Sequence, residues 1–389
     1  LFYVCCSIVA QSTGKPPEWT NCLLTHCSGL EKDAGIRFGY LTVPENHAQP
    51  DGRKLRLAFA VLKAQSKATF PDPVVYLSGG PGAKSLDRLR SWKDHSLRKD
   101  RDLILVDFRG IGYSEPFLCP ELNEALFKLF AADLTFEAER EYKKRLLFDC
   151  FAEMKAEGLD LNQYHSAAVV RDLEMLRTAL GYEQWNLFGI SYGTRVALTY
   201  LRDRPAHIRS AILDSAVPVG SGALSAHSNA YRQSLGEFFS LCEKDPACNE
   251  RFPKLEDQFY QAMNGLKTDP IVLRSPTYPE GRFYANFQEA HLAFHQLLYN
   301  RSNYPVLPWL VEAIQEKDTD LFDNMMAGMK ARNDRFSLGV AYLVNRYDHY
   351  RPLPAEPLAP EDPLFQALSY FESEQSIVRA ILPTDLVKK

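Results

Sequence analysis

The sequence predicts an α/β fold in which a mostly parallel sheet carries helices on both faces. Several short apolar runs have the composition of strands that are buried on both faces. They lie at residues 74–78, 103–107, 185–190 and 210–214. Helical patterns stand between these runs, and alternating strands and helices are typical of a parallel sheet. The clearest helix is expected over 166–180, where Ser166 could cap the start and Gly181 ends the helix.

Other segments complete the expected organisation. Residues 36–43 and 55–63 read as strands joined by a turn at 49–52, and residues 121–158 read as helical. From residue 216 onward the texture changes, because 228–335 is helical in pattern and no further buried-strand signal of similar quality follows. Five prolines between 352 and 363 then indicate an extended segment. We expect a sheet-bearing core over residues 13–215 and a helical cap over residues 216–389.

The most informative motif is a glycine-flanked serine between a strand and a helix. The apolar run from Trp185 leads into Gly189-Ile190-Ser191-Tyr192-Gly193, and a helix-forming run follows at once. This order is typical of a nucleophile elbow, a sharp strand-to-helix turn that exposes a strained serine hydroxyl. Glycines suit so tight a turn because side chains at these positions would collide. Ser191 is therefore the candidate nucleophile.

Two further loops follow apolar strands. Gly79-Gly80-Pro81-Gly82 comes directly after the strand at 74–78, and a glycine cluster lets the backbone approach a substrate closely. The strand at 103–107 continues into Phe108-Arg109-Gly110-Ile111-Gly112-Tyr113-Ser114. We expect Asp107 and Arg109 to be structural, tying this second loop to its neighbours.

In this order the three motifs resemble the prolyl iminopeptidase and tripeptidyl aminopeptidase branch of the α/β-hydrolases. The likeness extends to Tyr40-Leu41-Thr42-Val43-Pro44-Glu45 and to Asp172-Leu173-Glu174 with Arg177, and it covers roughly residues 35–215. The resemblance implies an α/β-hydrolase fold with a cap over the active site. It also implies an oxyanion hole formed by the backbone amides of Gly80 and Tyr192. Ser78 departs from the pattern, since many members have histidine there.

Composition and cysteine usage point to a soluble protein of an oxidising compartment. The net charge is −4, no basic stripe suggests nucleic acid, and no apolar run could span a bilayer. Residues 1–12 look like the remnant of a secretory signal peptide, although a buried strand is the alternative. Six later cysteines form neighbouring pairs, for which unpaired buried thiols are the alternative. The expected bridges are Cys22–Cys27, from proximity alone, and Cys119–Cys150 and Cys242–Cys248, which the resemblance supports.

The sequence offers no convincing partners for Ser191. A serine nucleophile needs a histidine base and an orienting acid, which in this fold follow the serine along the chain. We therefore expect the 389 residues to be a fragment, with little turnover, that lacks the last strands with the acid and the histidine. His349, beside Asp348, and Asp214, at a strand end, are weak internal candidates.

For other polar residues we expect no catalytic or metal-binding role. His291 and His295 are four apart on an expected helix, but without a third ligand we take them as cap-surface or core residues. Asn300-Arg301-Ser302 is a glycosylation sequon, which matters only in a host that glycosylates secreted proteins.

These observations predict a secreted or periplasmic serine hydrolase that forms an acyl-enzyme on Ser191. An exopeptidase releasing residues from peptide N-termini is the leading hypothesis, with a short peptide or small acyl compound as substrate. A carboxylesterase and a non-catalytic protein lacking the histidine base are the alternatives. No cofactor, metal, nucleic acid or membrane partner is expected, and the oligomeric state stays open.

Overall fold

The computed structural model describes residues 16–30, 33, 35–67, 69–219 and 223–349, together with Leu364, Ala367 and Ile377. The chain divides into two compact units, which are considered separately. Unit 1 comprises Leu1–Leu118 and Asn162–Val219, and unit 2 comprises Cys119–Leu161 and Gly220–Lys389. Residues 119–161 thus cluster with the later helices, although the sequence places them in the predicted core. The predicted roles of a catalytic core and a cap over it remain predictions. The expectations for residues 1–12 and 352–363 fall outside the described residues.

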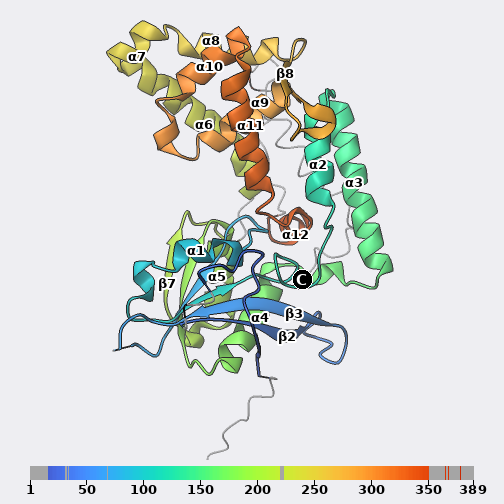
Figure 1. Ribbon diagram of the computed structural model, residues 1–389, viewed down its shortest axis with the longest axis vertical. Coiled ribbons are helices and arrows are strands. Elements are labelled where there is room, and N and C mark those ends of the chain that lie inside the picture. The colour runs from blue at the N-terminus through green and yellow to red at the C-terminus, as the bar shows by residue number, and fades with distance from the viewer. Residues whose placement is uncertain are drawn as a thin grey trace, which may run out of the picture. The chain divides into compact units, whose positions relative to one another are not determined.

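Unit 1 is built on a seven-stranded mixed sheet (Figure 1). Its strands are β1 (Glu18–Thr20), β2 (Ile36–Pro44), β3 (Lys54–Leu62), β4 (Val74–Leu77), β5 (Leu103–Val106), β6 (Trp185–Ile190) and β7 (Ile208–Asp214). In space they follow the order β1-β2-β3-β5-β4-β6-β7. Strands β5, β4, β6 and β7 are mutually parallel, whereas β1, β2 and β3 join them through antiparallel pairings. The parallel part therefore consists of the four apolar runs, and the predicted fold class is confirmed.

Short strands become central strands here because they are apolar on both sides. All four residues of β4 are buried, and successive side chains of a strand point to opposite faces. One face of β4 packs through Tyr76 against Trp92, whose ring centroid lies 4.5 Å away. Helix α5 packs against β4, β6 and β7, and α4 packs against α5.

The helices of unit 1 are short apart from these two. They are η1 (Leu86–Arg88), α1 (Leu89–Trp92), η2 (Ser96–Arg98), α4 (Ser166–Ala179), α5 (Tyr192–Asp203) and η4 (Pro205–His207), and η3 (Leu161–Gln163) lies at the boundary with unit 2. Helix α4 corrects one expectation, because Ser166 is not its cap. His165 precedes the helix in extended conformation, and its Nδ1 accepts a hydrogen bond from the Ala168 amide at 3.2 Å.

Unit 2 is mainly helical, as its sequence pattern predicts. Its helical segments are α2 (Leu122–Ala131), α3 (Phe136–Ala156), α6 (Ala223–Lys244), α7 (Pro246–Arg251), α8 (Leu255–Gly265), η5 (Pro279–Gly281), α9 (Phe287–Leu297), η6 (Arg301–Asn303), α10 (Leu307–Glu316), α11 (Thr319–Asn333), α12 (Leu338–Val344) and η7 (Asn345–His349). Their apolar faces form one large core that includes Phe238, Phe259, Phe294 and Phe322.

Two features of unit 2 differ from the expectation. The helix expected over 121–158 is two helices, because the chain turns at Ala132 and Thr135 caps the start of α3 through its side-chain oxygen. A small antiparallel hairpin also interrupts the helical region, formed by β8 (Ile271–Arg274) and β9 (Arg282–Ala285).

The structure contains all three expected disulfides. Cys22 pairs with Cys27 in unit 1, while Cys119 pairs with Cys150 and Cys242 with Cys248 in unit 2. The Cys119–Cys150 bridge joins the segment before α2 to the middle of α3. Among the described residues, no helix has both the length and the hydropathy needed to cross a membrane.

Candidate active site

Ser191 occupies a strained turn between β6 and α5. Its φ of 53° and ψ of −118° lie in a region that L-residues with side chains rarely adopt. Such a conformation persists only where the surrounding structure imposes it, and it is common at functional sites. The turn also places Ser191 directly before the first helical residue, Tyr192, so the positive end of the α5 dipole faces this region. The geometry expected for the Gly189–Gly193 motif is therefore present.

The flanking glycines are required by contact with neighbouring backbone. A Cβ atom on Gly189 would lie 2.6 Å from the Gly193 carbonyl oxygen and 2.8 Å from the Thr194 nitrogen. A Cβ atom on Gly193 would overlap the Leu77 carbonyl at the end of β4. Glycine at 189 therefore lets the end of β6 lie against the start of α5, and glycine at 193 lets the start of α5 approach the end of β4.

The Gly79–Gly82 loop lies against the serine. A Cβ atom on Gly79 would be 3.2 Å from the Ser191 Cβ and 3.8 Å from its hydroxyl oxygen. The next residue, Gly80, has a φ of 109°, which glycine adopts without strain. The buried Ser78 hydroxyl donates to the Ala83 carbonyl at 2.9 Å and so closes the loop. The structure therefore brings the two predicted motifs together, with Gly80 and Tyr192 each next to a residue of this contact.

The loop after β5 is organised around the buried carboxylate of Asp107. Its oxygens accept hydrogen bonds from the amides of Leu86 and Tyr113, both at 3.0 Å. Burial raises the pKa of Asp107 to about 7, although these backbone donors act in the opposite direction. Gly112 must be glycine, because a Cβ atom there would overlap the same carboxylate. Asp107 thus shapes its own loop, consistent with the structural role expected for it.

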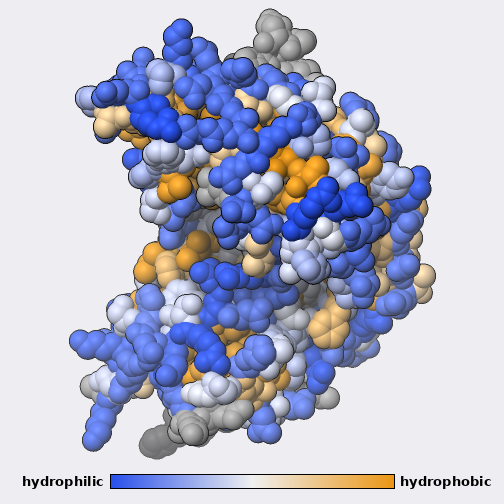
Figure 2. Space-filling model, turned by 45° about the horizontal axis from the view of Figure 1, so that its top comes forward, coloured by the Kyte–Doolittle hydropathy of each residue, from blue (hydrophilic) through white to orange (hydrophobic). Residues whose placement is uncertain are grey.

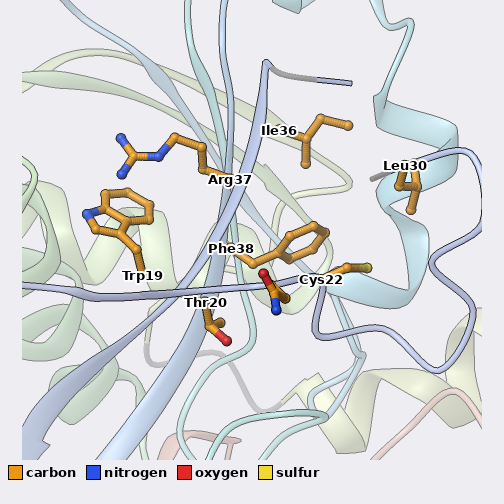
Figure 3. Close-up of a pocket in the computed structure, with 8 residues that line it drawn as sticks. Trp19, Thr20, Cys22, Leu30, Ile36, Arg37 and Phe38 are labelled. Carbon is orange, nitrogen blue, oxygen red and sulfur yellow. The ribbon is translucent and has the colours of Figure 1, made fainter. Parts of the chain in front are cut away.

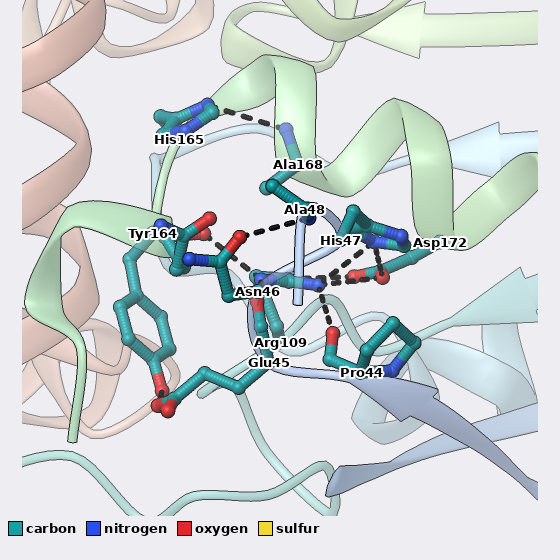
Figure 4. Close-up of polar contacts among 11 residues, drawn as sticks. Pro44, Glu45, Asn46, His47, Ala48, Arg109, Tyr164, His165, Ala168 and Asp172 are labelled. Atoms are coloured by element: carbon teal, nitrogen blue, oxygen red, sulfur yellow. Dashed lines mark hydrogen bonds and ion pairs between the residues drawn. The ribbon is translucent and has the colours of Figure 1, made fainter. Parts of the chain in front are cut away.

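Arg109 also has a structural setting, in a buried network that joins three segments (Figure 4). Its guanidinium donates to both carboxylate oxygens of Asp172 on α4, at 2.7 and 2.6 Å, and to the Glu45 carbonyl at 2.6 Å. His47 contacts the same carboxylate at 2.8 Å. Burial opposes ionisation of Asp172, but the adjacent Arg109 and His47 hold its pKa below the ordinary value. Tyr164 completes the network by donating to the Glu45 side chain at 2.9 Å.

Within the described part of the chain, Ser191 makes no side-chain hydrogen bond to an imidazole. His47 is held by Asp172, His207 contacts Glu174 at 2.8 Å, and His291 contacts the Tyr231 hydroxyl at 2.8 Å.

The weak internal candidates for acid and base gain no support. Asp214 is exposed, and its carboxylate accepts from the Ser215 hydroxyl at 3.0 Å. The side chain of His349, at the end of η7, lies outside the description.

His291, His295 and Asn300, for which no catalytic or metal-binding role is predicted, lie in unit 2. His291 lies in the core of unit 2, where burial lowers its pKa to about 3, and His295 lies one turn later on α9. No group of three or more His, Cys, Asp or Glu side chains suited to a metal ion occurs among the described residues. Asn300 is exposed, and its side-chain oxygen accepts from the Ser302 amide at 3.0 Å.

A cavity in unit 1 lies away from these motifs in sequence. It has a volume of about 450 Å³ and is lined by residues of β1, β2 and the segment around Cys22 (Figure 3). Arg37 and Trp19 both line it, with 3.6 Å between the Arg37 guanidinium carbon and the Trp19 ring centroid. None of Ser191, Gly80 and Tyr192 lines it.

The sequence reasoning missed one residue beside Ser191. The Thr194 hydroxyl donates to the Ser191 carbonyl at 2.6 Å and accepts from the Val217 amide at 2.8 Å. Its position directly after the glycine motif, in the first turn of the helix, was the available signal.

Comparison with known families agrees with this geometry. Residues 72–301, more than half of the chain, match the family described as alpha/beta hydrolase fold. The chain belongs to the α/β-hydrolase fold family. The expectation drawn from the three motifs is confirmed at this level.

Several named relatives are peptidases. The chain is 30% identical to a tripeptidyl aminopeptidase of Streptomyces lividans, over 47% of this chain and 35% of the relative. It is 25% identical to the serine protease Hip1 of Mycobacterium tuberculosis, over 60% and 46%. It is 27% identical to a proline iminopeptidase of Aeromonas sobria, over 55% and 44%. The chain spans less than half the length of these three relatives. Their names confirm the predicted resemblance to the prolyl iminopeptidase and tripeptidyl aminopeptidase branch.

Proposed function

We propose that this α/β-hydrolase is a serine peptidase in which Ser191 forms an acyl-enzyme. The observation that carries the proposal is the strained Ser191 turn, with the Gly79–Gly82 loop packed against it. Strain of this kind has an energetic cost, and it is common at functional sites such as a nucleophile elbow.

The backbone around Ser191 suits stabilisation of an oxyanion. Attack of the serine oxygen on a carbonyl places negative charge on the carbonyl oxygen. We assign the amides of Gly80 and Tyr192 as the donors to this oxygen, because they belong to the two segments that meet at Ser191. Each donor of this type is typically worth about 3 kcal/mol in the transition state. The start of α5 adds the favourable potential of a helix N-terminus.

The proposed reaction also requires a base that takes the Ser191 proton and later returns it to the leaving group. None of the described imidazoles is bonded to Ser191, so this proposal assigns the role of base to none of them. The pH dependence of Ser191 acylation would report the pKa of the group that acts as the base.

We favour peptide N-termini as the substrate class. The named relatives that support this choice are a tripeptidyl aminopeptidase and a proline iminopeptidase. The α/β-hydrolase scaffold by itself serves many chemistries, so an esterase acting on small acyl esters is the alternative outcome. Three disulfides favour an oxidising compartment, in keeping with secretion or a periplasmic location.

The test has two stages. A fluorophosphonate probe should label the protein covalently, peptide mapping should locate the adduct at Ser191, and Ser191→Ala should abolish labelling. Tripeptidyl and aminoacyl naphthylamides are then compared with p-nitrophenyl esters under the same conditions. Hydrolysis of esters alone would contradict the peptidase assignment, and absence of labelling would contradict the nucleophile.

A further inference from the structure

The backbone of Ser191 is linked to the segment that leaves the sheet directly through its amide, and through Thr194 by its carbonyl. The Ser191 amide donates to the Asp214 carbonyl at 2.9 Å, at the end of β7. The Ser191 carbonyl accepts from the Thr194 amide at 2.9 Å and from the Thr194 hydroxyl at 2.6 Å. The same hydroxyl accepts from the Val217 amide at 2.8 Å, two residues before this part of unit 1 ends.

These four hydrogen bonds form a closed bracket around the strained residue. One arm runs from the Ser191 amide to Asp214, and the other runs from its carbonyl through Thr194 to Val217. The two arms meet because residues 214–217 are continuous in sequence. A residue with a side chain keeps a strained backbone conformation only where the surrounding structure imposes it.

We propose that Thr194 is a positioning residue that holds Ser191 in its reactive conformation by linking it to residues 214–217. This inference rests on the proposed nucleophilic role of Ser191. Thr194 does not touch the substrate in this scheme. It acts on the backbone, so that the serine oxygen stays aligned with the oxyanion donors.

Because Thr194 is buried, its hydroxyl depends on protein groups for its hydrogen bonds. The residue has no exposed surface, and its oxygen both donates and accepts within the bracket. Loss of the hydroxyl would leave the Val217 amide without this acceptor, and it would leave the Ser191 carbonyl with the Thr194 amide alone. A polar group that is shielded from water and lacks a hydrogen-bond partner costs free energy. Residues 214–217 would therefore shift until the Val217 amide finds another acceptor.

Helix α5 provides a matched control. Thr199 is also buried, and its hydroxyl donates to the Arg195 carbonyl at 2.8 Å, one turn back on the same helix. Thr194→Val and Thr199→Val therefore remove the same group from the same helix, but only the first touches the bracket. Thr194→Ser keeps the hydroxyl and loses only a methyl group.

The experiment measures the rate of fluorophosphonate labelling at Ser191 in the complete protein, with the melting temperature of each variant. We expect Thr194→Val to slow labelling roughly 10- to 100-fold, the range expected for slight misplacement of a reacting group. Thr199→Val should stay within about twofold of the unmodified protein, and Thr194→Ser within about threefold. Labelling of Thr194→Val at the unmodified rate, or equal slowing by Thr199→Val, would overturn the proposal.

A second measurement separates this proposal from the proposed function. If the unmodified protein is not labelled, the nucleophile assignment fails, and hydrogen exchange of the Val217 amide then decides whether the bracket exists. Faster exchange at Val217 in Thr194→Val but not in Thr199→Val would support the link. Equal exchange in all variants would refute it.

Discussion

At the scale of single residues, Gly193 marks the closest approach between the sheet and the serine turn. A Cβ atom at this position would overlap the Leu77 carbonyl and would lie 3.0 Å from the Ser78 carbonyl oxygen. Both contacts are to backbone, which cannot move aside as a flexible side chain could. We expect Gly193→Ala to destabilise unit 1 by about 2 to 3 kcal/mol, within the usual range for overpacking. It should also abolish labelling of Ser191, and both effects can be measured by urea unfolding and fluorophosphonate capture.

Gly236 supplies the control for this substitution. It lies within α6, is exposed, and has no atom within 4 Å of an added Cβ. Gly236→Ala should therefore stabilise the protein by about 0.5 to 1 kcal/mol, the helix-propensity difference between the two residues. A loss of stability in Gly236→Ala, or an unchanged Gly193→Ala protein, would contradict the steric account.

The glycine-framed turn at Ser191 was predictable because the pattern that indicates it is local in sequence. A strand, a turn and a helix in order are visible in ten residues, and the strained turn follows from them. The Thr194 hydroxyl was not predicted because its partner, Val217, is 23 residues away and is brought near only by the pairing of β6 with β7. The sequence position of Ser166 suits a helix cap, but its hydroxyl contacts the Tyr192 hydroxyl at 3.0 Å instead.

At the scale of elements, the Arg109–Asp172 pair fixes the loop after β5 to helix α4. Their side chains are 1% and 3% exposed, so removing one partner would leave the other charge buried. We expect Asp172→Ala to cost about 3 to 5 kcal/mol, as breaking a buried ion pair generally does. The double variant Arg109→Met/Asp172→Leu should recover part of this loss, because no uncompensated charge remains. Urea unfolding of the two single variants and the double variant measures the coupling energy between Arg109 and Asp172. Strictly additive changes in unfolding free energy would exclude this coupling.

Elements were predictable where their apolar pattern was strong. The four parallel strands are short continuous apolar runs, and each was located within two residues. The β8–β9 hairpin was missed because its strands lack the continuous four-residue apolar runs of β4 and β5, and Arg274 and Arg282 face each other next to the loop that joins the strands. Three-residue β1 was missed for the same reason, since its residues are all exposed and its pairing with β2 alone defines it.

At the scale of the whole molecule, the core of unit 2 carries a pH dependence through His291. Burial, together with the charge of Lys267, lowers the pKa of His291 to about 3, below the ordinary value of about 6.5 for an unfolded chain. The folded state therefore binds fewer protons than the unfolded state between these values. Stability is complete above pH 6.5 and falls as the pH decreases toward 3.

This linkage predicts a loss of about 2 to 3 kcal/mol between pH 7 and pH 4.5. His291→Gln should remove that part of the pH dependence, although loss of the contact with Tyr231 will lower its stability at pH 7. His26→Gln, at an exposed position, should keep the slope of the unmodified protein. Urea unfolding at the two pH values checks the prediction. An equal loss of unfolding free energy between pH 7 and pH 4.5 in His291→Gln and in the unmodified protein would refute it.

The sheet edge at β7 carries the remaining prediction. The apolar run at 210–214 indicated a strand buried on both faces, but in the described residues β7 pairs with β6 alone and Ile212 is 52% exposed. On the face of the molecule that Figure 2 shows, hydrophobic patches lie among hydrophilic side chains. An exposed apolar edge with unpaired backbone groups can pair with another chain. We expect the 389-residue chain to self-associate as its concentration rises, and Ile212→Lys to reduce this association by placing a charge on the edge. Sedimentation at several concentrations measures the effect. Phe148→Lys, at a similarly exposed position on α3, should change the association little, because the attraction lies in the strand edge rather than in exposed apolar area as such.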